Sequence, residues 1–201
     1  MQKNLFDIEN IQYTRTQTIS LDDAVLEKNR VIAAFRNDPR AEVYRLLRGQ
    51  VLTQLKSNNW NTLAITSPGE NAGKTLTAVN LAIAISQEVN HTVMLVDLDL
   101  RSPSVASTLG FEPRKGIEDC ILRGEPIENV IVNPQFNRLV VLPCRSLGEY
   151  SSELLTSPNM LALMDEIVSR YESRIIIFDC HHYSAMTTPW CLPNWSMPAC
   201  W

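Results

Sequence analysis

A loop of small and polar residues, set between an apolar run and a helical pattern, constrains the fold of this chain more than any other feature. The apolar run covers residues 63–65, the loop 66–75 and the helical pattern 75–87. A glycine-containing turn that opens into a helix can wrap a polyphosphate with its backbone N–H groups, while a lysine reaches the outer phosphates and a threonine ligates Mg²⁺. The loop therefore predicts nucleotide binding by the following residues: Gly69, Glu70, Asn71, Ala72, Gly73, Lys74, Thr75 and Leu76.

The loop departs from G-x-x-x-x-G-K-[ST] in one place, because Pro68 stands where the first glycine is expected and Gly69 follows one residue late. An ordinary glycine-containing turn with a surface lysine is the alternative interpretation. The strand-like run before the loop and the helical pattern after it favour a phosphate-binding loop. We therefore expect the chain to bind ATP or GTP.

Apolar, β-branched segments alternate with helical patterns along the chain. Helical spacing of apolar residues occurs over 75–87 and again over 160–168. Such alternation predicts one α/β domain with a doubly wound, mostly parallel sheet. Residues 1–28, which have mixed polarity and no clear periodicity, are expected to form a flexible N-terminal arm. The segments with the character of buried parallel strands are 62–65, 92–96, 138–142 and 174–178.

Composition argues against several classes of function. The net charge of −4 is too mild to suggest an electrostatic nucleic-acid binder. No apolar run approaches the roughly 18 residues that cross a bilayer, and the first residues lack the apolar core of a secretory signal. We therefore expect a cytoplasmic protein with no nucleic-acid partner.

Three acids close predicted strands, at the edge of the sheet where doubly wound proteins bind their ligands. Asp97 and Asp99 are two residues apart, so their carboxylates project from the same face while the chain stays extended, and could share one Mg²⁺ shell. Asp179 ends the apolar run 175–178, as does the acid of a Walker B strand. One such acid alone would be a solvated strand terminus, but three beside a phosphate loop predict a metal–nucleotide site.

From about residue 29 to residue 179, the chain resembles the bacterial tyrosine kinases of capsule and exopolysaccharide synthesis. These are P-loop proteins of the deviant-Walker type, unrelated in fold to eukaryotic kinases. The family's Walker A motif corresponds to residues 69–75, its D-x-D-x-R Walker A′ motif to 97–101 and its Walker B strand to 175–179.

A helix predicted near residues 40–56 adds a further point of resemblance. Glu42, Arg45 and Arg48 are spaced three apart, as in the family's E-x-x-R-x-x-R motif for ring assembly, and line one helical stripe. By spacing alone, a solvated charged stripe with an internal ion pair is the favoured interpretation. Its position just before the nucleotide-binding strand, as in the family, indicates an oligomer interface instead. The apolar residues of this helix expected to face the core are Val43, Leu46 and Leu47.

The resemblance implies transfer of the ATP γ-phosphoryl group to tyrosine hydroxyls, mainly on neighbouring copies of the same protein. On that basis Lys74 and the loop amides hold the β- and γ-phosphates. Thr75, Asp99 and Asp179 then form the Mg²⁺ environment. Asp97 is the best candidate to orient or deprotonate the tyrosine hydroxyl, although Asp97 and Asp99 could exchange duties. The catalytic candidates are thus Lys74, Asp97 and Asp99.

The resemblance also implies partners. These are further copies of the chain in a ring-type homo-oligomer and a transmembrane polysaccharide co-polymerase that acts as activator. The protein is then expected to lie on the cytoplasmic side of the inner membrane, held at its periphery through that partner.

The last residues, 180–201, differ in composition from the rest of the chain. They hold three of the five Cys, three of the four Trp and two of the three His, and they lack the family's C-terminal tyrosine cluster. A metal site is one interpretation, but no paired C-x-x-C or H-x-x-x-H spacing is present. Read one base out of phase, the tail can match the family, so we predict a frameshifted, non-native tail. The kinase domain over 29–179 would then be incomplete, with an unpaired sheet edge, poor solubility and weak or absent ATP binding.

Two alternative functions share this architecture. A MinD/ParA-like ATPase of the chromosome- or septum-positioning type uses nucleotide-driven dimerisation, but its signature lysine early in the loop is replaced here by Gly69. A catalytically idle ATP-binding regulator, assembled on a membrane-bound polysaccharide co-polymerase, is the other. Substitution of Lys74 separates a kinase, which would lose tyrosine phosphorylation, from such a scaffold.

Overall fold

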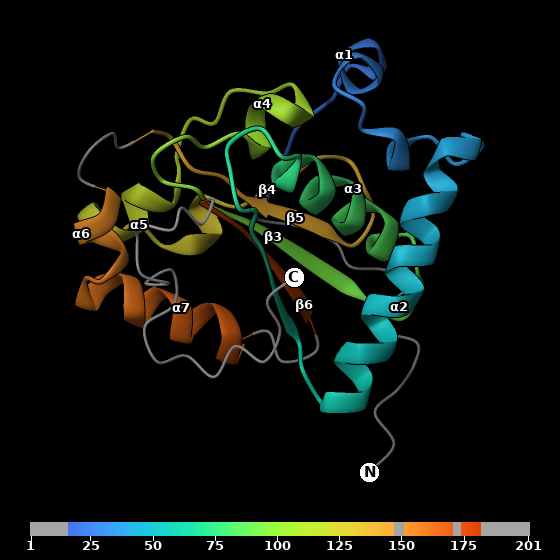
Figure 1. The fold of residues 1–201 in the computed structure, drawn as a ribbon. Coiled ribbons are helices and arrows are strands. Elements are labelled where there is room, and N and C mark those ends of the chain that lie inside the picture. Colours follow the sequence, from blue (N-terminus) through green and yellow to red (C-terminus); the bar gives the residue numbers. More distant parts are fainter. Residues whose placement is uncertain (1–15, 147–150, 171–173, 182–201) are drawn as a thin grey trace.

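The computed structural model describes residues 16–146, 151–170 and 174–181 (Figure 1). The strands are β1 (Gln17–Thr18), β2 (Thr62–Ile65), β3 (Thr92–Leu98), β4 (Val132–Asn133), β5 (Leu139–Leu142) and β6 (Arg174–Cys180). The α-helices are α1 (Asp23–Lys28), α2 (Glu42–Asn58), α3 (Lys74–Ser86), α4 (Val105–Leu109), α5 (Ile117–Arg123), α6 (Ser151–Leu155) and α7 (Pro158–Arg170). Short 3₁₀ helices are η2 (Ile32–Ala34), η3 (Pro39–Ala41) and η4 (Ile127–Asn129).

The strands form a single mostly parallel sheet in the order β1-β4-β5-β3-β6-β2. Only the β4–β5 pair is antiparallel among the described pairs. The predicted α/β fold is confirmed, and β2 has the predicted bounds. Strands β3 and β6 each run two residues further than predicted, because both remain paired as far as Leu98 and Cys180.

Helices cover both faces of the sheet, so the core has two layers (Figure 1). Helices α2 and α3 pack on one face, and α5 and α7 pack on the other. Helix α3 is buried on nearly every side, with ten of its thirteen residues buried. The helix that follows the phosphate loop is therefore held by packing rather than by its own helical propensity.

The structure includes part of the predicted N-terminal arm in the domain. Strand β1 pairs with β4, and α1 buries Leu26 in the core. The side chain of Asn80 in α3 accepts a hydrogen bond from the Ala33 N–H and donates one to the Arg30 carbonyl, which fixes the connection to α2. A two-residue strand and a six-residue helix are too short to give a periodic pattern, so the sequence did not reveal them.

Helix α2 turns a different face to the core from the one predicted. Val43 and Leu46 are 61% and 64% exposed, which contradicts their expected burial. The reason is that an alternative apolar stripe at spacings of three and four residues packs against the domain and rotates Val43 and Leu46 into solvent. The members of that stripe are Tyr44, Leu47, Val51 and Leu55.

Strand β2 lies at one edge of the sheet within the described residues, since β6 is its only strand neighbour there. The same part of the chain holds no helix that is both long enough and apolar enough to span a membrane. The arrangement places the carboxyl ends of β2, β3 and β6 together, and the loop between β2 and α3 lies at that end.

Candidate nucleotide-binding site

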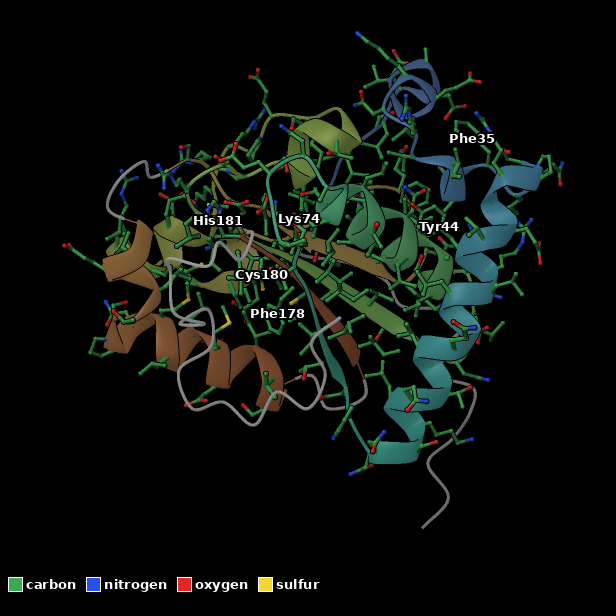
Figure 2. All side chains as sticks on the ribbon, in the orientation of Figure 1. Phe35, Tyr44, Lys74, Phe178, Cys180 and His181 are labelled. Atoms are coloured by element: carbon green, nitrogen blue, oxygen red, sulfur yellow. The ribbon has the colours of Figure 1, made fainter. Side chains whose placement is uncertain are left out.

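The predicted phosphate loop leaves β2 at Ile65 and enters α3 at Lys74. Gly73, the residue before the helix, has φ of +87°, a left-handed conformation that glycine adopts at little cost. This turn places Lys74 at the carboxyl ends of the strands, where Figure 2 shows it at the same end of the sheet as His181. The N–H groups of the first turn of α3 thus face the region where the sheet ends.

A cavity of about 500 Å³ lies over this loop. Seven of the eight residues predicted to bind nucleotide line it, and Gly69 is the exception. The other lining residues come from the segment after β3 and from the end of β6: Asp99, Ser102, Ser104 and His181. The predicted loop residues thus form one wall of a cavity, and the structure adds its far wall, while nucleotide binding there stays a prediction.

Lys74 and Asp99 form an ion pair across the cavity, with 2.7 Å between Lys74 Nζ and Asp99 Oδ2. Burial alone would raise the pKa of Asp99, but hydrogen bonds from Lys74 and His181 outweigh it and lower that pKa. Burial would likewise lower the pKa of Lys74, yet the hydrogen bond to Asp99 and the charge of Asp179 raise it. Both groups are therefore held charged.

Thr75 and Asp179 form a second pair at the same end of the sheet. Thr75 Oγ1 donates to Asp179 Oδ2 at 2.6 Å and lies 2.9 Å from Ser104 Oγ. Burial raises the pKa of Asp179 to about 6. The other carboxylate oxygen, Oδ1, is buried without a hydrogen-bond partner among the described residues. Such an orphaned oxygen beside a threonine hydroxyl fits the oxygen-rich surroundings of Mg²⁺.

Asp97 lies behind the cavity instead of lining it. Its side chain is fully buried, and its oxygens accept hydrogen bonds from the backbone N–H groups of Asp99, Ser104 and Val105. Burial, followed by the nearby charge of Asp179, raises the pKa of Asp97 to about 8. Asp97 thus anchors the segment that follows β3.

The expectation that Asp97 and Asp99 project from one face does not hold, because β3 ends at Leu98 and alternation stops with it. Asp97 and Asp179 are instead direct neighbours on adjacent parallel strands. Asp99 alone of the two D-x-D acids lines the cavity.

No group of three or more His, Cys, Asp or Glu side chains in the described residues is arranged to hold a metal ion by itself. The predicted metal residues Thr75, Asp99 and Asp179 therefore form a partial set. This fits Mg²⁺, which proteins commonly bind through one or two carboxylates together with phosphate oxygens and water. The tail residues considered for a separate Cys/His metal site lie, from 182 onward, outside the described residues.

His181 was not predicted as part of this site. Its Nδ1 lies 2.9 Å from Asp99 Oδ1, and its carbonyl accepts a hydrogen bond from Thr66 Oγ1 at 2.8 Å. The available signal was position alone, because His181 follows the Walker B acid by two residues. His181 also lies within residues 180–201, whose composition marks them as a foreign tail.

The Glu42, Arg45 and Arg48 stripe is not part of the cavity. Arg45 Nε contacts Glu42 Oε2 at 2.7 Å, and Arg45 also donates to the Arg36 carbonyl. Arg48 turns toward α3 and donates to the carbonyl of Ala84 at 2.9 Å, while its Nε lies 3.1 Å from Glu88 Oε1. The two arginines therefore make contacts within the chain.

Comparison with known proteins agrees with this geometry. The model of the CobQ/CobB/MinD/ParA nucleotide binding domain matches residues 63–180. Tyrosine-protein kinase YwqD of Bacillus subtilis is 30% identical over 162 residues, which cover 77% of this chain and 67% of that protein. The chain belongs to the bacterial tyrosine kinases of this nucleotide-binding family. The resemblance predicted from the motifs is thereby confirmed.

Other members of the family are longer. Tyrosine-protein kinase ptk of Acinetobacter johnsonii is 26% identical over 75% of this chain, and the match spans 21% of that protein. Among solved structures, the chimerical protein CapA2B2 superposes with a TM-score of 0.68 at 23% identity, over 87% of this chain and 73% of that one. The cell division ATPase MinD of Pyrococcus furiosus gives a TM-score of 0.51 at 23% identity, over 63% of this chain and 52% of that one. These structural likenesses concern the fold alone.

Proposed function

We propose that this chain is an ATP-dependent protein tyrosine kinase that acts on tyrosines of neighbouring copies and takes part in exopolysaccharide synthesis. The observation that carries the proposal is the cavity at the phosphate loop, into which Lys74, Thr75 and Asp99 converge. The name of YwqD as a tyrosine-protein kinase supports the acceptor chemistry. The name of the succinoglycan biosynthesis transport protein ExoP of Rhizobium meliloti, 23% identical over 74% of this chain and 19% of that protein, supports the pathway.

The residues of the cavity divide the chemistry between them. The N–H groups of the loop and the Lys74 ammonium bind the β- and γ-phosphates, and the ammonium neutralises part of the negative charge of the γ-phosphate. Thr75, Asp179 and Asp99 would hold Mg²⁺, which neutralises phosphate charge when bound. The γ-phosphoryl group passes to the tyrosine oxygen, ADP leaves, and the phenolic proton must be accepted by a nearby base.

Asp99 suits the role of that base better than Asp97. Asp99 lines the cavity and has a lowered pKa, so it is ionised and faces the reacting groups. Asp97 is buried behind the cavity, and burial raises its pKa to about 8, so near neutral pH it is largely protonated and cannot accept a proton. We therefore assign Asp97 a positioning role, through the segment it anchors.

Nucleotide binding and phosphoryl transfer are measured separately, because the sequence also predicts weak or absent ATP binding for the chain as written. Binding of Mg·ADP is followed by calorimetry, and phosphotyrosine is detected after incubation with Mg·ATP. Lys74→Met is expected to abolish the phosphotyrosine signal and to weaken Mg·ADP binding on the order of a hundredfold. Lys115→Met is the matched control, because Lys115 lies outside the cavity and pairs with Glu125. ATP turnover by the unaltered chain without any phosphotyrosine would refute kinase activity and favour a MinD-type ATPase, whose fold is shared.

The proposed partners are further copies of the chain in a ring and a transmembrane polysaccharide co-polymerase. Helix α2 supports the first, because Val43 and Leu46 expose apolar surface beside Glu42, which is 60% exposed. The kinase names of the relatives and the transport name of ExoP support the second. Location at the periphery of the inner membrane, through that partner, belongs to the same proposal.

A further inference from the structure

His181 bridges the phosphate loop and the acid that follows β3. Its backbone carbonyl is held by Thr66, the first residue after β2, and its ring reaches Asp99 from the end of β6. The side chain is 27% exposed and forms part of the cavity wall. The backbone of His181 is thus fixed by Thr66, and its ring contacts Asp99 in the site.

The direction of the hydrogen bond follows from the charge of Asp99. A carboxylate has no proton to donate, so the contact at 2.9 Å requires a proton on His181 Nδ1. Free imidazole side chains mostly carry the proton on Nε2, so this contact selects the less common tautomer. The tautomer is therefore a direct report of whether the contact exists.

Both oxygens of Asp99 are engaged. Oδ2 receives the ammonium of Lys74 at 2.7 Å. Oδ1 accepts from His181 Nδ1 at 2.9 Å and from the backbone N–H of Ser102 at 3.0 Å. With only 2% of the Asp99 side chain exposed, a metal ion can reach this carboxylate only if one of these contacts is released.

We propose that His181 is a positioning residue for Asp99: its Nδ1–H holds the carboxylate in the orientation that pairs with Lys74, and it releases Oδ1 when a magnesium nucleotide binds. The second half of this inference rests on the proposed nucleotide function, and the first half does not. His181 acts on the site through Asp99 and has no part in the transfer of the phosphoryl group.

The first measurement uses no nucleotide. Long-range ¹H–¹⁵N spectra of the imidazole rings are recorded on the full chain at mildly alkaline pH, where free imidazole is neutral. The chain has three histidines, so His181 is assigned by comparing the chain with its His181→Gln variant. We expect the Nδ1–H tautomer at His181 and its loss in Asp99→Asn, with the signal of His91 unchanged. An Nε2–H ring that ignores Asp99→Asn overturns the proposal.

The second measurement titrates Mg²⁺ into the chain in the presence of ADP. In His181→Ala the Mg²⁺ concentration at half-saturation should fall by up to about tenfold, the lower range for losing a hydrogen bond to a charged group. Affinity for ADP without Mg²⁺ should not change. An unchanged or higher midpoint, or a His181 tautomer that persists when Mg·ADP is bound, contradicts the proposal.

Two conservative variants separate positioning from simple packing. Asn places a side-chain N–H near the position of Nδ1, whereas Gln places it near Nε2. His181→Asn should therefore keep the midpoint of the unaltered chain, and His181→Gln should resemble His181→Ala. If ADP binds to none of these proteins, the proposed function fails, while the nucleotide-free spectra still decide whether His181 holds Asp99.

Discussion

Short motifs predict both the phosphate loop and helix α2, but only in the loop do the motif residues lie where the motif predicts. Seven predicted loop residues line one cavity, as the motif requires. Helix α2 has the predicted length and lies two residues further along the chain than predicted, yet Arg48 packs toward α3 and Val43 and Leu46 face solvent. The two motifs depend on different interactions. The loop motif forms its site with its own backbone, whereas the face that a helix turns to solvent is decided by the elements that pack against it.

The largest expected effect comes from a substitution in the phosphate loop. Lys74→Met should lower Mg·ADP affinity on the order of a hundredfold, because a charge-assisted contact to phosphate is lost. Calorimetry measures the change, with Lys115→Met as the unaffected control. Since the substitution also leaves Asp99 without its cation, the melting temperature is measured in parallel to show that the variant is folded. Unchanged affinity in Lys74→Met would show that this cavity is not the nucleotide site.

The two buried acids of the site predict an unusual pH dependence. Asp97 and Asp179 have folded pKa values of about 8 and about 6, above the ordinary 3.8, so the folded state binds their protons more tightly than the unfolded state. Their contribution to stability is complete below about pH 4 and is lost as the pH rises through 6 and then 8. The free energy of unfolding, from urea titrations without nucleotide, should therefore decrease from pH 5 to pH 8.5.

Asp179→Asn is the matched variant for that measurement. It removes one of the two titrations and also the charge that helps to raise the pKa of Asp97. The decrease in unfolding free energy between pH 5 and pH 8.5 should become smaller. Stability that rises over this range in the unaltered chain would show that both acids are ionised in the folded state.

A smaller effect tests whether Arg48 of α2 stabilises the folded chain. Arg48→Ala should lower the free energy of unfolding by about 1–2 kcal/mol, because the carbonyl of Ala84 loses a charged donor and the carboxylate of Glu88 loses its ion-pair partner. Arg40→Ala is the control, since Arg40 is exposed and pairs with Asp38 outside the core. Equal stability of Arg48→Ala and the unaltered chain would show that the contacts of Arg48 do not stabilise the fold and would favour a role for Arg48 in an oligomer interface.

The smallest effect on stability is expected at the exposed apolar residues of α2. The double variant Val43→Ser, Leu46→Ser should change the free energy of unfolding by no more than about 0.5 kcal/mol, as is usual for exposed positions. If this face joins copies in a ring, the mass measured by light scattering should fall toward that of one chain. Leu55→Ala is the matched core variant and should cost about 2–5 kcal/mol. Assembly that survives in the double variant would contradict an interface at Val43 and Leu46.

The sequence predicted those parts of the fold and site that depend on local pattern. Apolar, β-branched runs identified β2, β3 and β6, the helical pattern after the loop identified α3, and the acids that close β3 and β6 identified site candidates. What it missed depends on contacts distant along the chain. Asp97 is removed from the cavity by N–H groups of the following segment. His181 joins it through Thr66 and Asp99, which lie 115 and 82 residues away. The frameshifted tail, residues 180–201, stays a prediction, because only Cys180 and His181 of it are described. If the prediction holds, the His181–Asp99 contact is a property of this chain and not of its family.

Helix α3 sets how freely this sequence can drift over evolutionary time. Ala78, Ala82 and Ala84 are at most 1% exposed in a helix surrounded by packed neighbours. A larger side chain at any of them would overpack the core, and a polar one would be buried without a partner. The loop before the helix tolerates a proline in place of a glycine and still forms its cavity. We therefore expect the small residues of α3 to change more slowly in evolution than the residue identities of the loop that precedes them.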